Sequence, residues 1–182
     1  MTHAQCVALL EAVRSPVYRG VLGVMYGCGL RIGEAVAVAV AVKDIDAAQM
    51  VIRVVGKGNK ERLAPLSQAL LEDLRRMWWT THRHAQWLFA NKRGSHHVDE
   101  GEPYKVFGQV RCALKLDDTV KPHSLRHSFA TRLMEQGVPA ETVRILLGHA
   151  SIKTTQTYLH LTEPIRRQVN DVVSGFSVSL FD

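Results

Sequence analysis

The sequence has few cysteines, fewer acidic than basic residues and no long apolar run, and each shortage excludes a class of protein. Its 3 cysteines include no C-x-x-C pair, so we expect reduced thiols rather than a disulfide framework. No apolar run approaches the roughly 20 residues that span a bilayer. The first apolar run, Cys6 to Leu10, lacks a preceding cationic segment and stops at Glu11, which does not fit a signal peptide. We therefore expect a cytoplasmic protein without membrane association.

The shortage of acidic residues leaves the chain basic. Lys and Arg number 23 against 17 Asp and Glu, which gives a net charge of +6. A basic balance favours an anionic partner, of which nucleic acid is the commonest, although a merely soluble basic protein fits the charge as well. The apolar share of 46% and the length of 182 residues are typical of one globular domain with a sizeable core.

Helical periodicity and capping residues predict a largely helical chain. Thr2 is a suitable N-cap for a first helix that stops near Ser15-Pro16, and an apolar helix follows over Val17–Tyr26. Glycines at Gly137 and Gly148 mark the ends of two later helices. The further helices that we expect span Ser67–Thr81, Tyr104–Leu114, His123–Gln136, Pro139–Leu147, a short segment from Ser151 through Tyr158, and a last one from Glu163.

One β-hairpin is predicted in the middle of the chain. Met50–Val55 and Lys60–Leu66 have the composition of strands, and Gly56–Asn59 between them is typical of a turn. Asp44–Asp46 reads as a turn before the first strand. The short apolar run Trp87–Phe89 is either a further strand or a plug into the core.

The tip of this hairpin is basic. It carries Lys57, Lys60 and Arg62 against a single acid, Glu61. A lysine between two glycines suggests a phosphate contact, but the G-x-x-x-x-G-K-[ST] loop of nucleotide-binding proteins is absent. A hairpin tip that merely faces solvent is the alternative.

Arg31 follows two glycines and has apolar neighbours on both sides, so we expect it to be largely enclosed. An enclosed arginine needs an anionic partner. Glu34, three residues on, could be that partner, and a bound anion could serve instead. The following run, Ala35–Val42, is four Ala-Val pairs, and because both members are apolar, its period of two does not separate a helix from a buried strand.

A second group of polar residues gathers near the C-terminal part of the chain. His123 and Arg126 lie three residues apart and therefore project side by side from the first turn of a helix, where free N–H groups favour an anion. His149 follows Gly148, and Tyr158 comes nine residues later. Several cations with one phenol are what a metal-free site for phosphodiester cleavage would need.

These residues stand in motifs that resemble the tyrosine recombinase (phage integrase) catalytic domain. The five motifs stand in the family's order at family-like spacing, which is a strong signal, whereas each alone is weak. They are Gly29-Leu30-Arg31-Ile32-Gly33-Glu34, Gly56-Lys57-Gly58-Asn59-Lys60-Glu61-Arg62, His123-Ser124-Leu125-Arg126-His127, Leu146-Leu147-Gly148-His149 and Thr154-Thr155-Gln156-Thr157-Tyr158.

The resemblance covers essentially the whole chain and implies a fold. That fold is α+β and mainly α, with helices packed around a small antiparallel sheet, and its arginine-bearing helix favours a helix over about Ile32–Val40. We expect residues 1–173 to form the catalytic domain and 174–182 a loose tail, with the family's N-terminal DNA-clamping domain absent. The Ala-Val run makes the interval between Arg31 and the Asp44–Asp46 turn about one dipeptide longer than is usual in the family.

The resemblance also implies the chemistry of each step. Tyr158 would attack the scissile phosphate and form a 3′-phosphotyrosyl link. Lys57 would protonate the leaving 5′-oxygen, and His123 would assist deprotonation of Tyr158. No metal and no cofactor is required.

The remaining implied residues bind rather than react. Arg31 and Arg126 would clamp the phosphate, with His149 as a further donor, and Lys60 and Arg62 would contact DNA. The partners would be double-stranded DNA and further copies of the chain, assembled as a tetramer by exchange of the C-terminal helix over Pro164–Val173.

Three other hypotheses remain open at this point. One is a truncated, catalytically silent DNA-binding remnant of a recombinase. Another is a metalloenzyme using His123 and His127, although Ser124 stands where the zincin motif needs Glu and a packed or capping role suits His127 better. A type IB topoisomerase would share the same chemistry.

Overall fold

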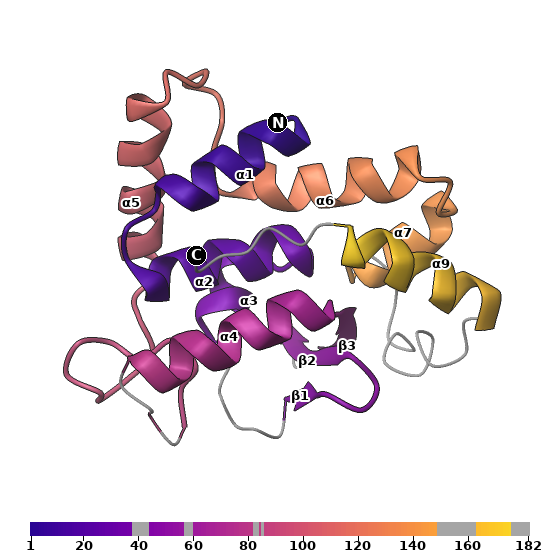
Figure 1. The fold of residues 1–182 in the computed structure, drawn as a ribbon, viewed down its shortest axis with the longest axis horizontal. Coiled ribbons are helices and arrows are strands. Elements are labelled where there is room, and N and C mark those ends of the chain that lie inside the picture. Colours follow the sequence, from indigo (N-terminus) through magenta and orange to yellow (C-terminus); the bar gives the residue numbers. More distant parts are fainter. Residues whose placement is uncertain (38–43, 57–59, 82–83, 85, 149–162, 176–182) are drawn as a thin grey trace.

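The computed structural model describes residues 1–37, 44–56, 60–81, 84, 86–148 and 163–175. Within these ranges there are eight helices and a small three-stranded antiparallel sheet, which lies at the lower edge of the molecule in Figure 1. Helix α2 lies in the middle, with α1 and α6 along one side and α4 along the other, and it contacts all three (Figure 1). This arrangement confirms the predicted α+β, mainly α class.

The first two helices begin where their capping residues predict. Helix α1 spans His3–Ala12, and the Thr2 side chain accepts from the backbone N–H of Gln5 in a capping box. Helix α2 spans Pro16–Gly27, with Ser15 as N-cap and proline in its first turn. Both predictions are confirmed, because capping and the fixed φ of proline act within a few residues.

The predicted hairpin is present and has an additional edge strand. Strands β2 (Val51–Gly56) and β3 (Lys60–Pro65) pair antiparallel, and the turn between them lies outside the described residues. Strand β1 (Ile45–Asp46) pairs with β2. The prediction of Asp44–Asp46 as a turn alone was therefore wrong, because two residues gain strand pairing that only the neighbouring β2 supplies.

The later helices follow the predicted order. Helix α4 spans Gln68–Thr80 and is capped by Ser67. Helix α5 spans Gly101–Ala113, three residues earlier than its predicted start. The others are α6 (His123–Glu135), α7 (Ala140–Leu146) and α9 (Glu163–Ser174). The glycines predicted to end α6 and α7, Gly137 and Gly148, have φ of +80° and +70°, the left-handed conformation that glycine adopts at helix ends. The predicted segment from Ser151 through Tyr158 lies outside the described residues.

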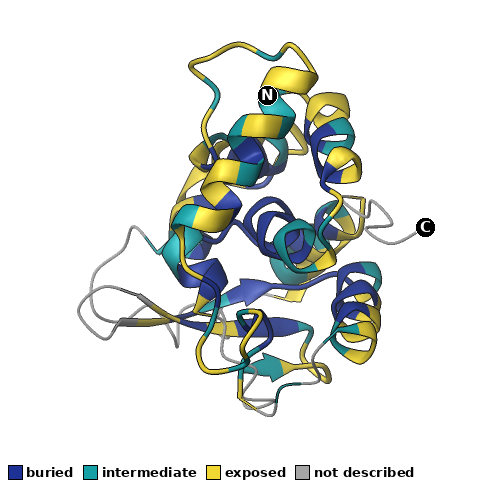
Figure 2. Cartoon of the chain, turned by 90° about the vertical axis from the view of Figure 1, so that its left-hand side faces the viewer, coloured by how far each residue is buried: buried dark blue, intermediate teal, exposed yellow. Residues whose placement is uncertain are grey.

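The core lies between the helices, where their buried faces meet (Figure 2). Leu88 and Phe89 plug into it, which decides between the two predictions for that run. Val169 and Val173 bury one face of α9 in the same core. Among the described residues, no helix is long and apolar enough to cross a membrane.

Candidate active site

The candidate site is built around one buried carboxylate, that of Glu34. Helix α3 spans Ile32–Val36, with Arg31 as its N-cap residue. Glu34 Oε2 accepts from the Arg31 backbone N–H at 2.8 Å, and Oε1 accepts from Arg31 Nη1 at 2.7 Å. Glu34 is therefore the partner of Arg31, as one of the two predictions had it. The predicted continuation of this helix to about Val40 runs into residues 38–43, which lie outside the described ranges.

Arg31 lies at the surface. Its side chain is 45% exposed, so the prediction that it is enclosed was wrong. The N-cap residue has an extended backbone (φ −74°, ψ 156°), and neighbouring side chains in extended chain point to opposite sides. Because Leu30 enters the core, Arg31 points outward.

Arg62 comes to the same carboxylate from strand β3. Its Nη2 donates to Glu34 Oε2 at 2.7 Å, and its Nη1 donates to the carbonyl of Leu146 at 2.9 Å. Its stem passes so close to Gly148 that a Cβ there would lie 2.7 Å from Arg62 Cδ. Arg62 is only 4% exposed, and it connects β3 and the end of α7 to Glu34. Its predicted contact with DNA stays a prediction.

Arg126 joins the cluster from the first turn of α6. Its Nη1 donates to the Gly29 carbonyl at 2.6 Å and its Nη2 to the Leu147 carbonyl at 2.5 Å. The Nη1 atom also lies 3.5 Å from Glu34 Oε2. The guanidinium group thus holds together the turn before α3 and the end of α7. Neither sequence reasoning nor motif spacing predicted these carbonyl partners.

His123 lies exposed at the N-terminus of α6, near both Arg31 and Arg126. Partial burial lowers its pKa, and the charges of Arg126, Arg31 and His127 lower it further. The ring is therefore neutral at pH 7 and able to accept a proton. His127 is exposed, which contradicts a packed role, so of the two predicted roles only capping stays a prediction.

The cluster carries more positive than negative charge. Burial alone would raise the pKa of Glu34, but the charge of Arg62 and the hydrogen bonds from Arg31 outweigh it and hold the pKa below its usual value. Burial and the charges of Arg62 and Arg31 lower the pKa of Arg126 to about 10, although Glu34 opposes this. Three guanidinium groups therefore share one carboxylate, an excess of two positive charges that favours a bound anion.

The structure thus brings together Arg31, Arg62, His123 and Arg126 of the predicted site residues. Lys57, His149 and Tyr158 lie outside the described residues, and the side chain of Lys60 is not described either. Among the residues that the structure describes, no group of three or more His, Cys, Asp or Glu could hold a metal ion. The sequence analysis named Arg62 but missed its burial and the central position of Glu34, although Arg62 alternates in phase with buried Ala64 along β3.

With this geometry in place, comparison with known proteins defines the class. The model of the phage integrase family matches residues 1–164, and the chain belongs to that family. The tyrosine recombinase XerD of Corynebacterium glutamicum is 38% identical over 158 residues, which cover 83% of this chain and 50% of that protein. The tyrosine recombinase XerC of Pediococcus pentosaceus is 38% identical over 154 residues, 79% and 49% of the two chains.

Solved structures agree with this assignment. The XerH site-specific recombinase bound to its difH substrate, in a pre-cleavage complex, matches with a TM-score of 0.71 at 25% identity, over 90% of this chain and 51% of that one. The chain spans about half the length of the curated relatives that it matches.

Proposed function

We propose that this chain is the catalytic domain of a site-specific DNA recombinase that cuts and rejoins strands through a phosphotyrosyl intermediate. The observation that carries the proposal is the arginine cluster, in which three guanidinium groups share the carboxylate of Glu34 and Arg31 reaches the surface. A phosphodiester is the anion that this family of relatives suggests, since they are named recombinases and the XerH complex contains its difH substrate.

Arg31 is the residue that would meet the phosphate first. It is exposed while Glu34 fixes its backbone and one guanidinium nitrogen, so its remaining donors are held ready for a phosphate oxygen. Arg126 lies deeper, at 2% exposure, and would bind a second oxygen by exchanging one carbonyl partner. Fixed positive charge of this kind stabilises the extra negative charge of the pentacovalent phosphorus in the transition state.

In the proposed reaction, each of the remaining predicted residues has a role. The phenol oxygen of Tyr158 attacks phosphorus as the bond to the 5′-oxygen breaks, and Lys57 gives that oxygen its proton. Neutral His123 takes the phenol proton, a role that its lowered pKa supports. His149 donates a further hydrogen bond to the phosphate. A 5′-hydroxyl attacking the phosphotyrosyl link reverses the step and rejoins the strand.

The proposed partners are double-stranded DNA and further copies of the chain. In the proposed tetramer, α9 would exchange between copies, and its buried residues Val169 and Val173 would find equivalent apolar contacts in the neighbour. Since its substrate is DNA, we place the protein in the cytoplasm.

A nicked suicide DNA substrate tests the proposal. When the short 5′-hydroxyl fragment diffuses away after cleavage, the covalent protein–DNA adduct accumulates and is seen on a denaturing gel. We expect the wild-type chain to form the adduct and Tyr158→Phe to form none while binding the same DNA. An adduct that persists in Tyr158→Phe would refute the assignment of the nucleophile. DNA binding without any wild-type adduct would instead support the silent remnant.

A further inference from the structure

A second basic surface lies outside the arginine cluster, in the turn Lys92–Ser95, which we name the basic turn. Asn91 Oδ1 accepts from the backbone N–H groups of Arg93 and Ser95, both at 3.1 Å. Gly94, with φ of +67°, closes the turn by donating to the Asn91 carbonyl. Lys92 and Arg93 are both exposed. The turn is therefore held in one shape while its two cations face solvent.

Aromatic and histidine residues hold together the loop that carries the basic turn. Trp78 Nε1, from α4, donates to the His84 carbonyl at 3.1 Å, and His84 Nδ1 accepts from the Trp87 backbone N–H at 3.0 Å. Trp87 packs edge-on against His97, with ring centroids 5.2 Å apart. Trp79, beside Trp78 on α4, is 56% exposed. All 3 tryptophans of the chain therefore lie in this region.

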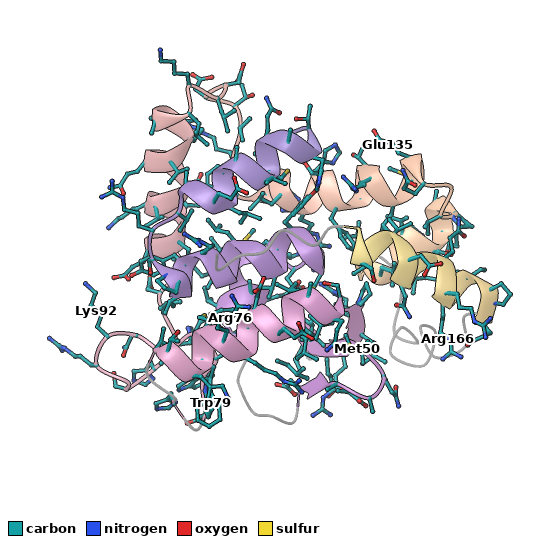
Figure 3. The ribbon with its side chains drawn as sticks, in the orientation of Figure 1. Met50, Arg76, Trp79, Lys92, Glu135 and Arg166 are labelled. Carbon is teal, nitrogen blue, oxygen red and sulfur yellow. The ribbon has the colours of Figure 1, made fainter. Side chains whose placement is uncertain are left out.

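The same loop ends beside the arginine cluster. A Cβ on Gly33 would lie only 2.7 Å from Glu100 Oε1, so Glu100 packs against the backbone two residues from Arg31. Ala90 and His97 pair between the turn and this end. The loop is therefore anchored near the proposed phosphate site at one end and presents the basic turn at the other. Figure 3 shows Lys92 at the outer bend of this loop, with its side chain directed away from the ribbon.

The two cations of the basic turn differ from the ion-paired arginines of the surface. Arg53, Arg144 and Arg166 each form an ion pair with an acidic residue. Within the described ranges, neither Lys92 nor Arg93 forms one. Two adjacent unneutralised cations on a rigid turn match the closely spaced phosphates of a nucleic-acid backbone, about one charge per 1.7 Å of duplex axis.

We propose that the basic turn binds the phosphate backbone of the DNA duplex that flanks the scissile phosphate. This proposal rests on the proposed function, because it extends the grip on the same DNA. The contact is made by charge and carries no base sequence information. It also adds to the affinity that the proposed phosphate contacts of Arg31 and Arg126 supply.

The salt dependence of DNA binding tests the basic turn directly. The double variant Lys92→Gln/Arg93→Gln is compared with wild type and with Arg166→Gln/Arg167→Gln, an adjacent pair with the same change of charge, on a short half-site duplex. Each lost phosphate contact lowers the slope of log K against log salt by about 1. We expect a reduction of about 2 for the turn variant and the wild-type slope for the control.

Tryptophan fluorescence gives a second readout that reports on this region alone. Because Trp87 lies in the loop that carries the turn and Trp78 is hydrogen-bonded to that loop, DNA binding there should change the emission of wild type, and this change should be lost in the turn variant. An unchanged slope, or a loss no larger than that of the control pair, would overturn the proposal. Wild-type adduct formation in the same buffer tests the proposed function separately, so the two failures are distinguishable.

Discussion

Glu34 is the residue whose replacement tests the arginine cluster most sharply. Glu34→Gln keeps the shape of the side chain but removes its charge, and its amide nitrogen cannot accept from a guanidinium group. Arg62 and Arg126, both buried, then lose their common anionic neighbour. Removing one partner of a buried ion pair destabilises a protein by about 3–5 kcal/mol, chiefly because the remaining charge is left uncompensated.

Thermal and urea unfolding, followed by circular dichroism, measure this loss. For a chain of 150–250 residues, 1 kcal/mol shifts Tm by about 2–4 °C, so we expect Tm to fall by about 6–20 °C. The matched control is Glu141→Gln, which breaks the exposed pair with Arg144. That pair is solvated on both sides, and its loss should leave the unfolding curve unchanged.

The pH dependence of the difference adds a second test. Because the pKa of Glu34 in the folded state lies below its usual value of 4.5, the stabilisation is complete above that value. It is lost as the pH falls through the folded-state pKa, where Glu34 becomes protonated. The gap between wild type and Glu34→Gln should therefore be constant near neutral pH and close in acid. A Tm within 2 °C of wild type at pH 7, about the shift for 1 kcal/mol, would refute the central role of Glu34.

Two further predictions concern the glycines and His123. Gly148→Ala should destabilise the fold by about 1–3 kcal/mol in urea unfolding, from positive φ and overpacking, because its Cβ would meet Arg62. Gly108→Ala is the control: in α5 its Cβ would meet nothing within 4 Å, so the change should stabilise the fold by about 0.5–1 kcal/mol. Equal effects of the two changes would contradict the assigned contact. Since the pKa of His123 lies below 6.5, the single-turnover rate of adduct formation should fall in acid with a midpoint below pH 6.5. His123→Gln should lose this acidic limb, and a midpoint at or above 6.5 in wild type would count against neutral His123 as the base.

Local signals in the sequence predicted most of the helices and the hairpin. The capping box of Thr2, the N-caps Ser15 and Ser67, and the terminal glycines Gly137 and Gly148 all act within about four residues of chain. Their outcome therefore depends little on the rest of the molecule. The edge strand at Ile45–Asp46 was missed because its structure depends on pairing with Ile52 and Val51 rather than on its own two residues.

Motif order and helical periodicity were enough to predict the fold class and the family, and the motifs identified Arg31, His123 and Arg126 as members of one site. Which arginine faces outward depends on the packing of the folded chain. Arg31 is exposed and Arg62 is buried, although the glycines before Arg31 and the basic hairpin tip around Arg62 suggested the reverse. The reason is that burial depends on partners far along the chain: Arg62 is held by the Leu146 carbonyl and Arg126 by that of Gly29. These contacts join segments that meet only when the helices pack around the sheet, and they leave Arg31 as the exposed arginine of the three.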